Sequence, residues 1–339
     1  MRAFVLTAYG GPERTALTDV PQPSPRAGEL LVRVHAAGLN PVDFKTRAGK
    51  LKIITRYPLP IVMGSELSGV VEAVGPGVTR FARNDRVFAR VDKKIMGAFA
   101  EYAVVHEDHA AWMPASLDFP AAAAVPLAAL TALQALRDEL QLSAGQRVFI
   151  PGGAGGVGTF AIQIAKHFGS HVATTASPRG EALVKRLGAD VVIDYSRERF
   201  EDKLSGYDCA FDLLGGETLA RLFSVLKPGG RVVSIAGMPE PVTARKDLGR
   251  GRWLAALFWV ASLKTRMQAA RHGLGYRYLF MHPSGADLAW LASLIDAKQL
   301  EVVVDRVFPF AEAKKAMAYL ETGHAKGKVV LALFPLPAR

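Results

Sequence analysis

A glycine-rich segment between an apolar run and a helical pattern constrains this chain more than any other feature. Gly153-Ala154-Gly155-Gly156-Val157-Gly158 directly follows the run 147–150 and opens a helical pattern over residues 156–168. Its GxGxxG spacing suits a dinucleotide-binding βαβ unit, where glycines allow a tight turn, close approach to a pyrophosphate and close helix packing. Free N–H groups at the helix start would hold the phosphates. We therefore expect the pyrophosphate at Gly156 and Val157, with Gly153, Gly155 and Gly158 shaping the loop.

Strand and helix patterns alternate from residue 147 to residue 235. Such alternation predicts a doubly wound parallel sheet of the Rossmann type with right-handed crossovers. The expected strands are 147–150, 171–175, 191–193, 209–214 and 231–235, with 278–281 as one more, and the expected helices between them are 156–168, 181–187 and 217–226.

The first third of the chain is rich in short β-branched runs separated by Gly and Pro clusters. The expected strands are 2–6, 30–37, 69–74, 86–90 and 98–105, and no helical period is sustained there. These runs predict a mainly antiparallel, barrel-like domain. An Ala- and Leu-rich helix over 121–140, bent near Pro126, follows it.

A length of 339 residues favours about two domains. The last segment should hold a helix over 286–297, a strand over 302–308, a helix over 311–321 and a strand over 329–333. We expect one domain from residues 1–125 and 284–339, and a nucleotide-binding domain from residues 126–283.

The end of the second expected strand bears on the choice of nucleotide. An NAD site usually carries an acid there for the ribose 2′-OH. This chain has Ser177 and Arg179 instead, which can bond a 2′-phosphate with charge assistance. Tyr195, after the third strand, could stack on adenine or reach the same phosphate. We predict NADPH, the alternative for Arg179 being a solvated surface charge.

Cysteine content and the lengths of the apolar runs bear on disulfides, zinc binding and cellular location. Cys209 is the one cysteine, so an intrachain disulfide and a Cys-rich zinc lobe are excluded, and we expect Cys209 to be a small buried hydrophobe. The N-terminal apolar run is too short for a secretory signal. No stretch reaches the ~20 apolar residues that span a bilayer. The expected location is the cytoplasm.

Several segments carry a family resemblance. The runs 38–45 (GLNPVDFK), 64–71 (GSELSGVV), 126–132 (PLAALTA) and 327–330 (GKVV), with the glycine-rich loop, resemble the zinc-independent quinone oxidoreductases and alkenal/enone reductases of the medium-chain dehydrogenase/reductase superfamily. The resemblance covers nearly the whole chain. It implies that the first domain is a GroES-like catalytic domain, and that the protein is a homodimer.

The same resemblance implies that the catalytic zinc of related alcohol dehydrogenases is lost. In those enzymes a Cys stands at the place of Asn40 and a His at that of Ser65, and only Glu66 survives here. Catalytic zinc needs three protein ligands. His106 and His109 have an HxxH spacing, but without a third partner we interpret them as surface histidines.

Further site residues are predicted from the resemblance. Asn40 and Lys45 would polarise the substrate oxygen, and Lys45 would also contact the cofactor. The other expected cofactor contacts are Thr131, in the junction motif, and residues at strand ends and one turn: Leu214, Ile235, Ala236, Lys326 and Gly327. Simpler interpretations remain open: Asn40-Pro41 as a turn, Asp43 as a helix cap, and Lys326 and Lys328 as solvated charges.

A basic, aromatic insert covers about residues 238–276. Residues 241–280 hold eight basic residues and one acid, Asp247, a net charge of +7 within a chain total of +11. The apolar run 253–263 is too short to span a membrane. Peripheral contact of residues 250–272 with an anionic membrane is one hypothesis. We favour packing on protein, either at the active-site mouth or at a dimer contact.

These observations predict an NADPH-dependent oxidoreductase that transfers hydride to quinones or to the C=C bond of α,β-unsaturated aldehydes and ketones, without zinc. A conjugated acceptor puts the arriving charge on an oxygen, where hydrogen-bond donors suffice. Two alternatives remain: a zinc-free alcohol dehydrogenase, and an NADPH-binding sensor or nucleic-acid-binding protein. We expect no nucleic-acid partner, because no RNA-binding motif appears.

Overall fold

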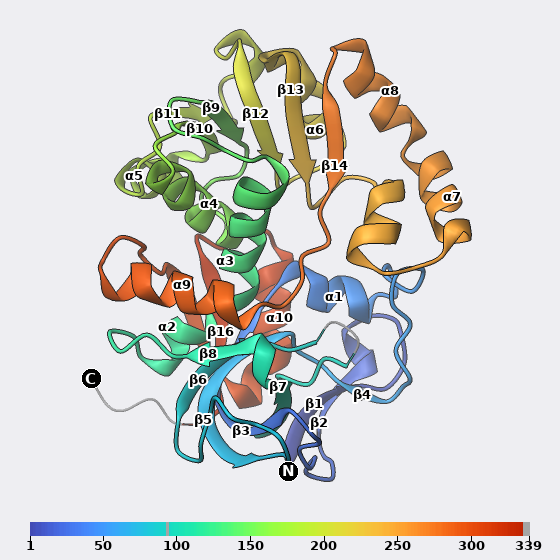
Figure 1. Ribbon diagram of the computed structural model, residues 1–339, viewed down its shortest axis with the longest axis vertical. Helices are drawn as coiled ribbons and strands as arrows, with labels where there is room; N and C mark the ends of the chain where they lie inside the picture. The colour runs from blue at the N-terminus through green and yellow to red at the C-terminus, as the bar shows by residue number, and fades with distance from the viewer. Residues whose placement is uncertain (93–94, 335–339) are drawn as a thin grey trace. The chain divides into compact units, whose positions relative to one another are not determined.

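The computed structural model describes residues 1–92 and 95–334. The chain divides into two compact units. The first contains Met1–Leu130 and the chain from Pro283 onward, and the second is Thr131–His282 (Figure 1).

The first unit is built on two sheets. In the described residues, a three-stranded sheet has the order β2-β1-β4, and a second sheet the order β15-β16-β3-β5-β6-β8, with β7 also on β3. All its pairings are antiparallel except that of β15 with β16, so the expected mainly antiparallel domain is confirmed. The strands are β1 (Arg2–Leu6), β2 (Thr15–Asp19), β3 (Glu29–Leu39), β4 (Ile61–Val62), β5 (Glu66–Val74), β6 (Arg86–Arg90), β7 (Tyr102–His106), β8 (Ala110–Trp112), β15 (Val304–Pro309) and β16 (Lys328–Ala332).

The core of this unit lies between the sheets and the helix α10 (Ala313–Glu321). Side chains that alternate along β3, such as Leu30, Val32 and Val34, are fully buried in it, as the period of a half-buried strand requires. α2 (Phe119–Ala123) packs on β3 and β5, while α9 (Gly285–Asp296) packs on β8.

The helix α1 (Pro41–Arg47) was not among the elements predicted for this third of the chain, although Asp43 was considered there as a helix cap. It follows β3 directly, with Asn40 extended at its N-cap and Pro41 at its first position. Proline suits that position because its missing N–H has no partner there in any helix. Seven residues are too few to display a helical period, which is why the sequence pattern missed α1.

The single bent helix expected over 121–140 is also corrected. The chain forms α2, then α3 (Pro126–Leu133), then a π-helix from Gln134 to Glu139. Pro126 therefore begins a helix instead of bending one, as proline does at a first helical position.

The second unit is the predicted doubly wound sheet. Its described strands pair in the order β11-β10-β9-β12-β13-β14, all parallel. They are β9 (Arg147–Ile150), β10 (His171–Ala176), β11 (Val191–Asp194), β12 (Tyr207–Asp212), β13 (Leu226–Ser234) and β14 (Gly275–Tyr278), and the helices α4 (Gly156–His167), α5 (Pro178–Arg186) and α6 (Gly216–Leu222) connect them. The order reverses between β9 and β12, and such a switch point is where open α/β sheets bind ligands.

The basic segment after β13 belongs to the alternating pattern. It contains a π-helix (Thr243–Asp247), α7 (Arg252–Ala261) and α8 (Leu263–Arg271). α8 packs on β14, so it is the crossover helix between the last two strands (Figure 1). The expected strand 278–281 is wrong by three residues, since β14 covers Gly275–Tyr278. In residues 1–92 and 95–334, no helix is long and apolar enough to cross a membrane.

Candidate active site

The glycine-rich loop joins β9 to α4 in the second unit, as its sequence context predicts. A Cβ at Gly153 would lie 2.1 Å from Thr174 Oγ1, and one at Gly158 would lie 2.6 Å from the Gly152 carbonyl oxygen. Neither distance is compatible with a side chain. These two glycines are therefore required by packing within the protein itself.

Gly155 is different. A Cβ there would meet no chain atom closer than 3.5 Å, so protein packing does not require this glycine. It is the N-cap of α4, makes no side-chain cap, and no acid follows in the first turn. The helix thus offers backbone N–H groups from Gly156 onward toward a space that a side chain would narrow. This cradle fits a nucleotide pyrophosphate.

Ser177, Arg179 and Tyr195 come together at the carboxyl ends of β10 and β11. Ala176 pairs with Asp194 across the two strands, and the Tyr195 N–H donates to the Ala176 carbonyl over 3.4 Å. Ser177 is the N-cap of α5, but its hydroxyl makes no cap bond. Tyr195 is 61% exposed, and Arg179 is exposed without an acidic partner in the described chain.

Sequence reasoning overlooked Asp194, a carboxylate at this same rim. It accepts hydrogen bonds from the Ser196 hydroxyl (2.7 Å) and the Ser196 N–H (3.0 Å), and Arg197 Nε lies 3.6 Å away. The bonds from Ser196 lower the Asp194 pKa. The sequence could have indicated Asp194, because this acid directly follows the strand predicted over residues 191–193.

Asp212 and Ser234 organise the neighbouring strand ends, and sequence reasoning missed both. Asp212 is fully buried; it accepts from the Ser234 hydroxyl (2.6 Å) and from the N–H groups of Leu214 (3.1 Å) and Gly215 (2.9 Å). The Ser234 hydroxyl in turn accepts from the Ala236 N–H over 3.2 Å.

This network holds the two chain segments that follow β12 and β13. It therefore fixes three predicted contact residues, Leu214, Ile235 and Ala236, at one edge of the sheet. Leu214 is 54% exposed there although it is apolar. Ile235 and Ala236 are partly buried, and the Ile235 N–H donates to the Asp212 carbonyl.

In the first unit, Asn40 lies in a buried polar network with Glu66 and Lys328. Asn40 Nδ2 donates to Glu66 Oε1 over 2.6 Å, while Lys328 Nζ donates to Asn40 Oδ1, to Glu66 Oε1 (2.7 Å) and to the Leu39 carbonyl (3.1 Å). Glu66 is 0% and Lys328 3% exposed. The interpretation of Lys328 as a solvated charge is therefore wrong.

This network fixes the orientation of the Asn40 amide. An ammonium only donates and a carboxylate only accepts, so the oxygen must face Lys328 and the nitrogen must face Glu66. One amide N–H serves Glu66, and the other nearby acceptor, the Gly38 carbonyl, is 3.5 Å away. Glu66 Oε2 accepts from the Leu127 N–H over 2.6 Å, which completes its hydrogen bonding.

Asp43, Ser65 and Arg90 form a second buried group beside this network. Asp43 accepts from the Asn40 N–H (2.8 Å) at the start of α1 and from the Ser65 hydroxyl (3.0 Å). It thus acts at the helix start, as the capping interpretation expected. Burial raises the Asp43 pKa to about 6 despite these hydrogen bonds. Arg90 is buried too, and its guanidinium donates to the Ser65 and Val91 carbonyls.

The remaining predicted residues are distributed over both units. Lys45 is half-buried on α1, has no acidic partner among the described residues, and burial lowers its pKa. Lys326 is partly buried, and Gly327 has a φ of +100° with Val303 O only 2.4 Å from a Cβ position. Thr131, buried within α3, is the first residue of the second unit.

The donors around Asn40 do not fit a catalytic zinc. The position offers an amide, a hydroxyl and the carboxylates of Asp43 and Glu66, whereas zinc takes three protein ligands of N, S or carboxylate O type. Asp43 already accepts from the Asn40 N–H and the Ser65 hydroxyl, and the ammonium of Lys328 already pairs with Glu66 at 2.7 Å. Within residues 1–92 and 95–334, no group of three His, Cys, Asp or Glu side chains could hold a metal.

A GroES-like unit joined to a doubly wound nucleotide unit is the layout of medium-chain dehydrogenases and reductases. Family models agree with this layout: an alcohol dehydrogenase GroES-like domain matches residues 26–115, and a zinc-binding dehydrogenase domain matches residues 187–331.

Individual relatives match over almost the whole chain. The chloroplastic NADPH-dependent alkenal/one oxidoreductase of Arabidopsis thaliana is 36% identical over 99% of this chain and 80% of its own. The quinone oxidoreductase of Coxiella burnetii superposes with a TM-score of 0.85 at 32% identity, covering 98% of this chain and 99% of its own. A mycobacterial protein solved with NADPH gives 0.82 at 29% identity, covering 98% and 100%. This chain therefore belongs to the medium-chain dehydrogenase/reductase superfamily, in its group of quinone oxidoreductases and alkenal/enone reductases.

Proposed function

We propose that this protein is an NADPH-dependent reductase of quinones or of the C=C bond of α,β-unsaturated aldehydes and ketones. The observation that carries the proposal is the buried network of Asn40, Glu66 and Lys328, in which an ammonium group and not a metal ion pairs with the Glu66 carboxylate. A site without a Lewis acid favours acceptors whose conjugation delivers the incoming charge to an oxygen.

The second unit supplies the cofactor contacts in this proposal. The α4 N-terminus, from Gly156 and Val157, would hold the pyrophosphate, with Gly155 leaving the space open. Ser177, Arg179 and Tyr195 would bind the adenosine 2′-phosphate, because a hydroxyl and an unpaired guanidinium lie at one strand-end rim. Leu214, Ile235, Ala236 and Thr131 would contact the rest of the cofactor, which supplies hydride when bound.

The choice of NADPH over NADH is supported by the charges at that rim. Asp194 would repel a 2′-phosphate, but it is hydrogen-bonded by Ser196 and lies 3.6 Å from Arg197 Nε. Arg179 has no such partner in the described chain, so its charge is available to the phosphate. The alkenal/one relative and the mycobacterial protein solved with NADPH agree with this choice.

The first unit supplies the substrate contacts. With its oxygen held by Lys328 and one N–H donated to Glu66, the Asn40 amide has a second N–H whose bond to the Gly38 carbonyl is long, at 3.5 Å, and would be exchanged for a substrate oxygen. Lys45 is the second donor, since its ammonium has no acidic partner in the described residues and is partly desolvated. Lys45, Lys326 and Gly327 would also contact the cofactor. In this proposal the proton that completes the reduction comes from water or a cofactor hydroxyl, because the Asp43 carboxyl beside this network is buried and engaged by the Asn40 N–H and the Ser65 hydroxyl.

Turnover of a substrate panel tests the proposal. NADPH oxidation would be followed with a 2-alkenal, an enone, a benzoquinone and a saturated aldehyde, each repeated with NADH and after chelator treatment. We expect conjugated substrates to turn over with NADPH, unaffected by chelator. Activity confined to the saturated aldehyde, or loss of activity on chelation, contradicts the proposed chemistry; a strict NADH preference contradicts the rim assignment.

Two broader proposals accompany this function. We propose a homodimer, for which β14 is suited as the edge strand of the parallel sheet, with backbone groups on one side unpaired within the described sheet. Light scattering at several concentrations tests it. A cytoplasmic location is proposed from the single, buried cysteine, which suits a reducing compartment, and cell fractionation tests that location.

A further inference from the structure

The helices α7 and α8 expose a row of large apolar side chains. Trp253 is 69%, Leu257 39%, Val260 64% and Met267 49% exposed. The spacing of four and three residues places Trp253, Leu257 and Val260 on one side of α7, and Met267 follows on α8. With Trp259 and Leu263, 50% and 36% exposed, they form what we call the α7–α8 apolar face.

The opposite side of α7 is already packed. Leu254 is 1%, Ala255 2% and Phe258 4% exposed. A helix on the surface of a water-facing protein buries one apolar side and turns a polar side outward. α7 is apolar on both sides, so its outer side is not accounted for by the packing of this chain.

The charge around this face has a single sign. Between Asp247 and Asp287 the sequence contains no acidic residue. The cations near the face are Arg250, Arg252, Lys264, Arg266 and Arg271. Within the described residues none of these five forms an ion pair, although Arg266 stacks on the Trp259 ring at 5.3 Å.

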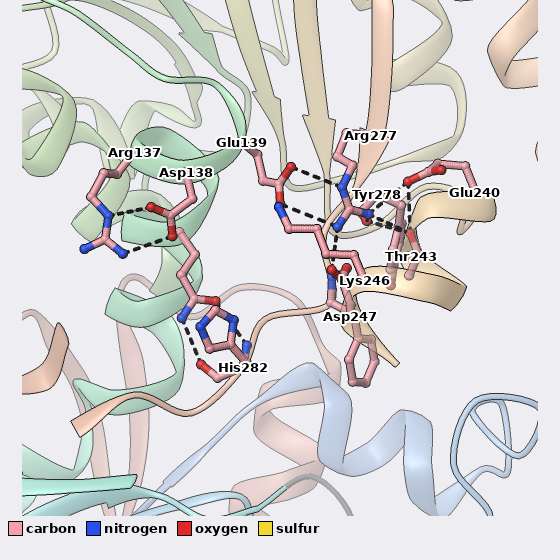
Figure 2. Close-up of polar contacts among 12 residues, drawn as sticks. Arg137, Asp138, Glu139, Glu240, Thr243, Lys246, Asp247, Arg277, Tyr278 and His282 are labelled. Atoms are coloured by element: carbon pink, nitrogen blue, oxygen red, sulfur yellow. Dashed lines mark hydrogen bonds and ion pairs between the residues drawn. The ribbon is translucent and has the colours of Figure 1, made fainter. Parts of the chain in front are cut away.

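The acidic side chains of this region pair with Arg277, which is labelled in Figure 2. Its guanidinium pairs with Glu139 (3.1 Å), Glu240 (2.9 Å) and Asp247 (2.5 Å), and Lys246 also pairs with Glu139 (2.6 Å). These three carboxylates are 4–11% exposed. They fix the base of the segment without lowering the positive charge of its outer face.

We propose that the α7–α8 apolar face docks on the surface of an anionic lipid bilayer. Tryptophan rings favour the depth of lipid headgroups, and basic side chains beside them are attracted to anionic lipids. Lys264 and Arg271 can reach past the apolar row with their charged ends in the headgroup layer. A second copy of the chain is the poorer occupant, since it would bring five unpaired cations against five.

This inference does not depend on the proposed reductase activity. The inner side of α7 packs on protein, as the sequence favoured, and the proposal concerns only its outer side. The helices would lie in the plane of the interface, as short amphipathic segments with basic flanks do.

Flotation with vesicles tests the proposal on the full chain. We expect co-flotation with phosphatidylcholine vesicles that contain phosphatidylglycerol and little with phosphatidylcholine alone. Raising the salt concentration to ~1 M should release the protein, because the Debye length falls from about 10 Å to about 3 Å. The double variant Trp253→Glu/Val260→Glu should bind at least about tenfold more weakly, since two apolar side chains that would enter the bilayer surface are replaced by charged ones.

The matched control is the double variant Ile53→Glu/Ile95→Glu, which places the same two charges on side chains 63% and 49% exposed in the first unit, against 69% for Trp253 and 64% for Val260. It should float like the wild type. The substituted sites of both variants are exposed, and circular dichroism checks their folding. Absence of flotation with anionic vesicles overturns the proposal, as does equal flotation of the Trp253→Glu/Val260→Glu variant. A concentration-dependent dimer that this variant abolishes, without vesicle binding, would assign the face to a second copy.

Discussion

At the scale of single residues, Lys328 shows how position decides the role of a charge. The sequence left open that it is a solvated cation, yet its ammonium is buried and lies 2.7 Å from Glu66. Burying two charges is unfavourable unless they pair and all remaining hydrogen-bonding groups are satisfied. Here Asn40, Leu39 and Leu127 supply the remaining partners.

Lys328→Met should destabilise the protein by about 3–5 kcal/mol, because it leaves Glu66 buried without a compensating charge. The double variant Glu66→Gln/Lys328→Met should recover much of that loss, since no buried charge remains. Denaturant unfolding of the wild type, both single variants and the double variant measures the coupling. A single variant as stable as the wild type would contradict the buried pair.

Arg179 determines the cofactor preference in our proposal. Arg179→Ala should weaken NADPH binding by about tenfold and leave NADH binding unchanged, because only NADPH carries the 2′-phosphate. Lys185→Ala is the matched control, as Lys185 is an exposed cation on the same helix that already pairs with Glu181. Calorimetric titration with both nucleotides distinguishes the variants; equal losses for both nucleotides would show that Arg179 does not contact the phosphate.

At the scale of elements, the loop between β9 and α4 contains two kinds of glycine. Two are required by packing within the protein, and a third leaves space that a ligand can occupy. Gly153 and Gly158 are in contact with Thr174 and with the Gly152 backbone. A Cβ at Gly155 would lie no closer than 3.5 Å to another atom of the chain, and its φ of −79° is one that any residue adopts.

Of two alanine substitutions in this loop, one should therefore mainly weaken NADPH binding and the other should mainly lower stability. Gly155→Ala should leave stability unchanged and weaken NADPH binding about tenfold or more, since the methyl group enters the pyrophosphate cradle. Gly158→Ala should cost about 1–3 kcal/mol of stability, because its methyl group meets backbone. Thermal unfolding and nucleotide titration of both variants check this. Similar stability losses in the two variants would contradict the distinction.

At the scale of the whole molecule, the buried carboxyl of Asp43 links folding to pH. Its pKa of about 6 in the folded protein exceeds the ordinary unfolded value. The folded state therefore holds this proton at pH values where the unfolded state has released it. Through this group, stability falls as pH rises from about 4 to about 6 and then stays constant.

Asp43→Asn should remove this dependence, because the amide stays neutral at every pH. Relative to the wild type, the variant should gain stability between about pH 4 and about pH 7. Melting temperatures at both pH values measure the difference, with Asp108→Asn, at an exposed carboxylate, as the control. An unchanged difference between Asp43→Asn and wild type across this range would contradict a raised pKa.

Local patterns determined much of this fold. The strands Arg2–Leu6, Arg86–Arg90 and Arg147–Ile150 match the predicted ranges because each is a short apolar run that is buried almost throughout, a pattern visible in adjacent residues. The glycine loop was predicted for a similar reason, since strand, turn and helix follow one another directly. α1 and the π-helix were not, because a seven-residue helix shows no period and a π-helix depends on its partners.

The sequence by itself determined the two-part architecture, the dinucleotide loop and the absence of zinc-ligand residue types at Asn40 and Ser65. Only the tertiary structure decided which distant residues meet: Lys328 with Glu66, Asp212 with Ser234, and Arg277 with three carboxylates. The physical reason is that hydrogen bonds and ion pairs are short-ranged in space but unrestricted along the chain. Which charges are buried, and which remain facing outward on α7 and α8, therefore emerges only after folding.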